Sequence, residues 1–124
     1  MSAGRITGIG GIFIKARDPE ALKAWYRDHL GLAIGDWGGL VFENKDDPQG
    51  TTVWSVFKAD TTYFAPSTAP FMVNYRVDDL DALLARLRAA GCAVDDKTDK
   101  SEYGYFGWVM DPEGNRLELW QPPE

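Results

Sequence analysis

The sequence predicts an α+β domain built from two βαβββ modules that form one curved, eight-stranded mixed sheet around a cleft. The order of strand and helix patterns occurs twice, and the letters of the two halves correspond. KARDPEALKAWYRDHLGL (15–32) parallels RVDDLDALLARLRAAGC (76–92), and DPQGTTVWSV (47–56) parallels DPEGNRLELW (111–120). We therefore divide this single domain of residues 1–124 into module one (5–58), a connector (59–69) and module two (70–122).

Module one begins with residues 6–15, which alternate loosely and are rich in Ile and Phe, as is typical of a strand. Asp18-Pro19-Glu20 predicts a helix start, because it combines a capping acceptor, a proline at the first helical position and an acid in the first turn. Gly31 is the expected helix end. Further strands are predicted at 33–35, 38–43 and 51–57, with a turn-rich segment at 44–50.

Module two repeats this order. Asp78 or Asp79 is expected to cap a helix whose leucines share one face, and Gly91 should end it. The predicted strands are 71–77, 93–95, 105–110 and 116–121.

Composition limits the classes of partner. The net charge is −6, and an acidic surface repels phosphate backbones, so we expect no nucleic acid partner. No apolar run approaches the ~20 residues that cross a bilayer, and the N-terminus has no signal pattern, so we expect no membrane association and a cytoplasmic location. The single cysteine, Cys92, excludes a disulfide within the chain.

Three segments carry a resemblance to a known family: FIKARDPEALKAWYRDHLGL (13–32), FMVNYRVDDLDALLARLRAAG (71–91) and DPEGNRLELWQP (111–122). They resemble the vicinal oxygen chelate superfamily, which contains glyoxalase I, the bleomycin-resistance proteins and the extradiol dioxygenases. The resemblance implies paired βαβββ modules around a cleft, often in a homodimer. It also implies that a metal enzyme of this group would hold a divalent ion with four inward His or Glu side chains.

At the four positions that match those ligands, the sequence has Gly11, Trp54, Met72 and Glu118. Only Glu118 offers a donor suited to a hard cation, since glycine has no side chain, indole only donates, and a thioether is a soft ligand. His29 lies near the end of the first helix, away from these positions. We therefore expect no metal and no cofactor, although a metal site with unforeseen ligands stays open.

Glu118 is the central candidate. It alternates with Leu117 and Leu119, so it should lie on the opposite face of its strand, towards the cleft. There it could act as a general acid or base, or anchor a ligand amine; alternatively it only pairs with Arg116 or a lysine. The expected ligand-binding residues are Trp54, Tyr63, Met72, Asn74, Tyr103, Trp108, Glu118 and Trp120. About half of the aromatic residues should instead belong to the core, and Asn74 could simply satisfy a neighbouring backbone group.

These observations favour a glyoxalase- or bleomycin-resistance-like protein that binds a small aromatic or cationic molecule in a metal-free cleft. The alternative is a metal-independent lyase or isomerase in which Glu118 is the general acid or base. The sequence leaves open whether the protein is an enzyme.

Overall fold

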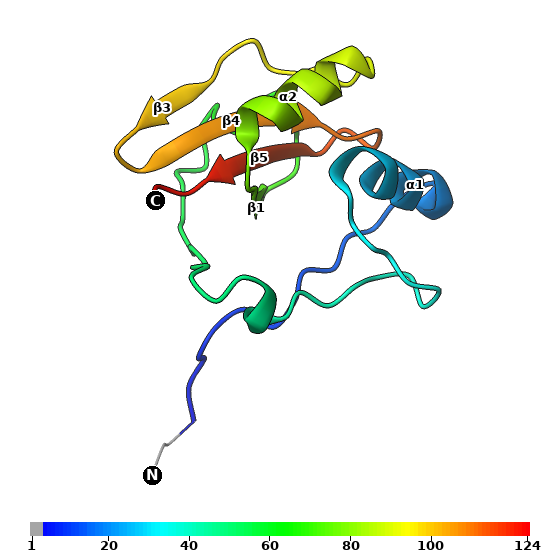
Figure 1. Cartoon of the computed structure of the whole chain (residues 1–124). Helices are drawn as coiled ribbons and strands as arrows, with labels where there is room; N and C mark the ends of the chain where they lie inside the picture. Colours follow the sequence, from blue (N-terminus) through cyan, green and yellow to red (C-terminus); the bar gives the residue numbers. More distant parts are fainter. Residues whose placement is uncertain (1–3) are drawn as a thin grey trace.

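The structure is a computed structural model that describes residues 4–124. It contains two helices and a mixed five-stranded sheet (Figure 1). The elements in chain order are α1 (Pro19–Leu30), the short 3-10 helix η1 (Asn44–Asp46), β1 (Val73–Arg76), α2 (Leu80–Ala89), β2 (Ala93–Val94), β3 (Asp99–Ser101), β4 (Gly104–Met110) and β5 (Arg116–Gln121). Among residues 4–124, no helix combines the length and apolar character needed to span a membrane.

All five strands come from module two. The sheet runs in the order β1-β5-β4-β2, and β3 pairs with another part of β4. β1 lies parallel to β5, whereas β4 is antiparallel to β5, β2 and β3. The register places Asn74 of β1 and Trp108 of β4 on either side of Glu118 of β5. Three strands thus bring side chains of one face together at Glu118.

Both helices begin as their sequences predict, whereas α2 is capped at Ala90, one residue before the predicted Gly91. The Asp18 carboxylate accepts a hydrogen bond from the Ala21 N–H at 3.1 Å, and Asp79 does the same for Ala82 at 3.1 Å. Each bond satisfies a backbone donor that the first turn leaves without a helical partner. Gly31 ends α1 in the left-handed conformation, with φ of 70°.

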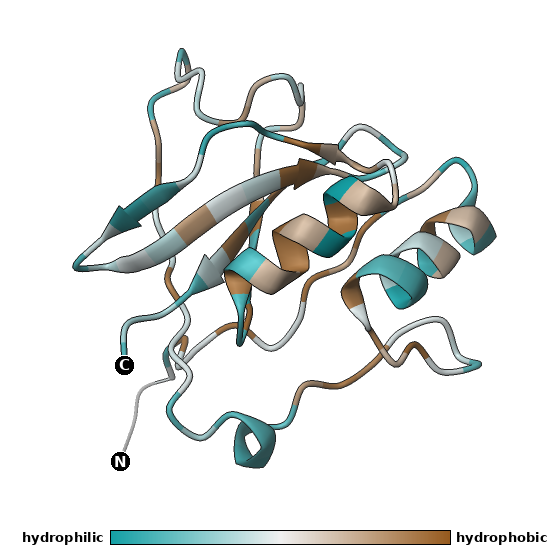
Figure 2. Ribbon diagram, turned by 45° about the horizontal axis from the view of Figure 1, so that its top comes forward, coloured by the Kyte–Doolittle hydropathy of each residue, from teal (hydrophilic) through white to brown (hydrophobic). Residues whose placement is uncertain are grey.

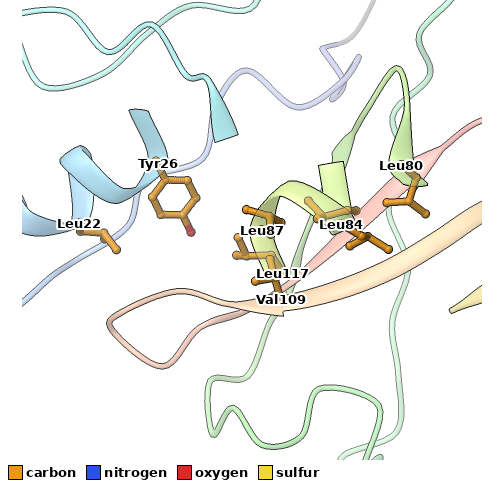
Figure 3. Close-up of a cluster of buried hydrophobic side chains, with 8 residues drawn as sticks. Leu22, Tyr26, Leu80, Leu84, Leu87, Val109 and Leu117 are labelled. Atoms are coloured by element: carbon orange, nitrogen blue, oxygen red, sulfur yellow. The ribbon is translucent and has the colours of Figure 1, made fainter. Parts of the chain in front are cut away.

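The core lies between α2 and one face of the sheet. Leu80, Leu84 and Leu87 of α2 are at most 2% exposed, and they share a buried cluster with strand residues on β4 and β5. Figure 2 shows the hydrophobic side of α2 turned towards the sheet. Figure 3 shows Leu22 and Tyr26 of α1 approaching the same cluster from the side. The strand residues of this cluster are Val109, Leu117 and Leu119.

The strand predictions for module one are not met in this chain. Residues 4–17 and 31–58 contain no strand, and the eight-stranded sheet is replaced by five strands. The physical reason is that a strand is stable only in a ladder, and these segments have no neighbouring strand to pair with. In module two the expected strands form at slightly different bounds, and β3 is an additional strand between two of the predicted ones.

A buried carboxylate attaches α1 to module two. Asp111 is 5% exposed and accepts a hydrogen bond from the Tyr26 hydroxyl at 2.8 Å and from the Asn115 amide at 2.8 Å. Next to it, the Glu113 carboxylate accepts from the backbone N–H of Arg17 at 2.9 Å. The turn between β4 and β5 therefore holds the start and middle of α1 in place.

Tyr26→Phe is expected to lower the free energy of unfolding by roughly 1–3 kcal/mol, because Asp111 keeps its buried charge and loses a donor. Urea denaturation measures the change. Tyr105→Phe is the matched control, since Tyr105 is 38% exposed and its hydroxyl makes no hydrogen bond within the described residues. Equal losses for the two variants would contradict this role of Tyr26.

Candidate functional site

Glu118 lies on the face of β5 opposite the core. Its neighbours Leu117 and Leu119 are each 1% exposed and pack under α2, so the alternation places the Glu118 side chain on the other side of the sheet. Glu118 is nevertheless only 8% exposed. A carboxylate at this position must be stabilised by polar partners, because burial removes most of its water.

Three neutral groups donate hydrogen bonds to Glu118. The Trp108 indole Nε1 donates to Oε2 at 2.9 Å, and the Asn74 side-chain amide donates to Oε1 at 2.7 Å. The Tyr63 hydroxyl donates to Oε2 as well. Asn74 and Trp108 reach Glu118 because they lie opposite it on the two adjacent strands. We call these four residues the Glu118 cluster.

The Glu118 cluster contains no cation. None of the ion pairs within residues 4–124 includes Glu118. The pairing with Arg116 that the sequence left open is absent, since the Arg116 guanidinium binds Asp95 at 3.1 Å and lies 5.3 Å from the Trp108 ring centre. The hydrogen bonds to Glu118 therefore come from neutral groups, while the Arg116 guanidinium lies over the Trp108 ring without an ion pair to Glu118.

The connector covers this cluster. Tyr63 contacts Trp108 edge-on at 6.1 Å, and the rings of Phe57 and Phe64 lie 5.3 and 6.4 Å from the Tyr63 ring. The backbone hydrogen bonds of residues 58–69 stay within the connector, so side chains alone attach it to the sheet. We did not predict that Phe57 and Phe64 support the site. The one sequence feature that could have indicated it is the grouping of aromatic residues around a polar connector.

Burial raises the pKa of the Tyr63 hydroxyl above its usual value of 10.0, and its hydrogen bond to Glu118 adds to the rise. Burial likewise raises the pKa values of Tyr26 and Tyr75. All three hydroxyls are therefore neutral at physiological pH. Tyr63 can donate a hydrogen bond to Glu118 under these conditions.

These tyrosines predict a loss of stability in alkali. These tyrosines keep their protons up to a higher pH in the folded chain than in the unfolded chain. Their contribution to the free energy of unfolding is therefore complete below about pH 10 and is lost as the pH rises above it. Urea denaturation between about pH 8 and pH 11 should show this decline, and it should be smaller in Tyr26→Phe. The same pH dependence of the free energy of unfolding in wild type and variant would mean that Tyr26 does not contribute to the alkaline loss of stability.

The other predicted site residues lie apart from the Glu118 cluster or have no bond to it. Trp120 stacks on Phe106 at 6.1 Å and donates its indole N–H to the Tyr103 carbonyl at 2.9 Å, so these residues form a second aromatic group. Met72 is half-buried directly before β1. Trp54 is 78% exposed, and within the described chain it has no hydrogen bond or ring contact with the cluster. Roles of these residues in ligand binding stay predictions.

The donor set does not fit a metal. Both Glu118 oxygens already accept hydrogen bonds from N–H or O–H groups, and the groups around them are donors that cannot give an electron pair in that orientation. Across residues 4–124, no group of three or more His, Cys, Asp or Glu side chains is arranged to hold a metal ion. We therefore derive no chemistry that requires one.

Comparison with solved structures gives full-length matches of low identity. TnmS3, an antibiotic binding protein from Streptomyces sp. CB03234, is 21% identical over 97% of this chain and 99% of its own, with a TM-score of 0.58. A lactoylglutathione lyase from Agrobacterium tumefaciens is 21% identical over 95% of this chain and 96% of its own, with a TM-score of 0.57. At this identity the two matches show a shared fold.

A glyoxalase/bleomycin resistance protein from Streptomyces sp. CB03234 is 39% identical, but the match covers only 40% of this chain and 42% of that one, with a TM-score of 0.37. It supports no conclusion about the whole fold. No curated protein matches the sequence. The Glyoxalase-like domain family, in contrast, matches residues 11–120, which is most of the chain. The chain therefore belongs to the glyoxalase-like domain family, as its three sequence segments predict.

Proposed function

We propose that this protein binds a small aromatic or cationic organic molecule at the Glu118 cluster, without a metal. The observation that carries the proposal is a carboxylate at 8% exposure that three neutral donors hold and no cation neutralises. A positively charged N–H group beside Glu118 would gain a charge-assisted hydrogen bond in a site partly removed from water. The proposal includes a cytoplasmic location and a homodimer.

Tyr63 is the donor that a ligand would replace. Asn74 and Trp108 belong to paired strands, whereas Tyr63 belongs to a connector that has only side-chain contacts with the sheet. Displacing Tyr63 would remove one of the two donors to Glu118 Oε2, which would keep its hydrogen bond from Trp108, and would uncover one side of the Trp108 ring. An aromatic cation could then stack on Trp108 and donate to Glu118. TnmS3, which shares the fold, is described as binding an antibiotic, and this supports a small-molecule ligand.

Benzamidine and benzamide provide a matched pair of probes, because they share a ring and shape and differ in charge. We expect benzamidine to quench tryptophan fluorescence with saturation, and benzamide to bind at least ~10-fold more weakly. A metal chelator should leave the benzamidine titration unchanged. Equal affinity for the two probes, or quenching by neither, would refute an anionic binding site.

A metal-independent lyase or isomerase is the second candidate, favoured by the Tyr63 hydroxyl that donates to Glu118. Such a phenol–carboxylate pair can pass a proton to and from a substrate. Glu118→Gln separates the two functions, since an enzyme would lose roughly 10²–10⁴-fold in turnover with any substrate found, whereas a binding protein loses only affinity.

A further inference from the structure

Arg116 places a second charge on the sheet face that presents Glu118. The two residues are separated by one position on β5, so their side chains leave the same side of the sheet about 6.6 Å apart. The Arg116 guanidinium lies 5.3 Å from the centre of the Trp108 ring, whose indole N–H donates to Glu118. Arg116 is thus a cation beside the Glu118 cluster that makes no ion pair with it.

Most of the hydrogen-bond donors of Arg116 have no partner. Within residues 4–124, its Nη2 donates to Asp95 Oδ2 at 3.1 Å, and this is the one hydrogen bond of the side chain. Its Nε is buried and has no acceptor, and no other buried side-chain nitrogen or oxygen of the described residues is in that situation. A buried donor without an acceptor is unfavourable, and a bound molecule that carries an acceptor would satisfy it.

Asp95 does not use up the charge of Arg116. The Asp95 carboxylate also accepts the backbone N–H of Lys97 at 2.9 Å, and this bond, the bond from Arg116 and the charge of Lys97 lower the pKa of Asp95. Two cations therefore surround one carboxylate, which leaves one positive charge in excess. Water weakens the pairing further, since the Asp95 side chain is 29% exposed.

Tyr63 lies near both Glu118 and Arg116. Its hydroxyl donates to Glu118. Burial and this bond raise the pKa of the hydroxyl, whereas the charge of Arg116 lowers it, as expected of a guanidinium close to the hydroxyl. A ligand that takes the place of Tyr63 would therefore meet Glu118 and Arg116 together.

We propose that the ligand is an aromatic molecule that carries a carboxylate as well as a cation, and that Arg116 binds the carboxylate. This rests on the cation site proposed above. The cation donates to Glu118 while the carboxylate accepts from the unpaired N–H groups of Arg116, so each ligand charge faces its opposite. The spacing of about 6.6 Å along β5 suits two charged groups at opposite ends of a benzene ring.

Para-amidinobenzoate and para-amidinobenzamide test the proposal on the wild-type chain. The two probes share the ring, the amidine and nearly the same shape, and they differ in the charge of the second group. We expect the benzoate to bind at least ~10-fold more tightly than the benzamide, because only the benzoate makes a charge-assisted hydrogen bond with Arg116. Tryptophan fluorescence titration measures both affinities. Equal affinities, or tighter binding of the benzamide, would overturn the proposal without any variant.

Arg116→Gln should reduce the preference for the benzoate to less than about twofold, since the positive charge is removed. Arg116→Lys should keep part of the preference, because lysine supplies a charge without the planar set of donors. The control is Arg86→Gln, which removes an exposed arginine from α2 on the other side of the sheet and should keep the full preference. Both probes are compared on the same variant, so a general loss of folded protein affects them alike. A full preference in Arg116→Gln would refute the role of Arg116.

Glu118→Gln separates this proposal from the cation site on which it rests. We expect both probes to bind about 10- to 100-fold more weakly to that variant, with the preference for the benzoate retained. Unchanged affinities with a retained preference would contradict the cation site and leave Arg116 as a carboxylate site. Weaker binding of both probes, with no preference in the wild type, would contradict Arg116 alone. Absence of binding by either probe would contradict both proposals.

Discussion

Glu118→Gln is expected to weaken benzamidine binding by about 10- to 100-fold while the fold stays intact. Removing the charge replaces a charge-assisted hydrogen bond with a neutral one, which accounts for the loss. The substitution fits the site because the new amide oxygen can accept from Tyr63 and Trp108. Asn74 can turn its amide and present its oxygen to the new NH2 group.

Fluorescence titration measures this affinity, and circular dichroism verifies the fold. Glu102→Gln is the matched control, because it removes one exposed carboxylate from the same half of the chain. We expect that variant to bind benzamidine within about twofold of the wild type, since exposed charges are screened by salt. Equal affinities for Glu118→Gln and the wild type would mean that the probe binds elsewhere.

Leu84→Ala should have the largest effect on stability, a loss of about 2–5 kcal/mol in the free energy of unfolding. Leu84 is 2% exposed, and a Cβ built on Gly107 would lie only 2.9 Å from its Cδ1 atom. The helix therefore packs directly on the backbone of β4 at this point. Truncating the side chain leaves a cavity that the rigid strand cannot fill.

The comparison for Leu84→Ala is Leu83→Ala on the same helix. Leu83 is half-buried at the margin of the core, so its truncation should cost clearly less, about 1 kcal/mol. Urea denaturation gives both values. An unchanged slope of the free energy of unfolding against urea concentration would indicate that the unfolded state is the same in each variant. A smaller loss for Leu84 than for Leu83 would contradict the packing described here.

The sequence predicts both helices and the strands of module two well because each signal there is decided by nearby residues. Asp18 and Asp79 cap their helices as expected, and Gly31 ends α1, since capping needs only the adjacent backbone. The alternation around Glu118 also gives the right face, because Leu117 and Leu119 enter the core. These assignments require no information about distant parts of the chain.

In module one, local sequence signals are not sufficient to predict the strands. Residues 6–15 and 51–57 have strand-like composition, yet they form no strand in the chain, because a strand requires a partner that sequence pattern does not supply. The pairing of Glu118 with Asn74 and Trp108 depends on strand register in the same way. The cover formed by Tyr63 was not predictable from periodicity, because the connector has none.

The nitrogen-15 resonance of the Trp108 indole N–H, followed during a benzamidine titration, tests the Glu118 site most directly. This N–H donates to Glu118 at 2.9 Å, so a cation that binds the carboxylate must change its environment. We expect the resonance, assigned by Trp108→Phe, to move with saturation in the wild type and to move in Glu118→Gln only at about 10- to 100-fold higher benzamidine concentration. A Trp108 resonance that stays fixed while those of Trp37 or Trp54 move would show that Glu118 is not the binding site.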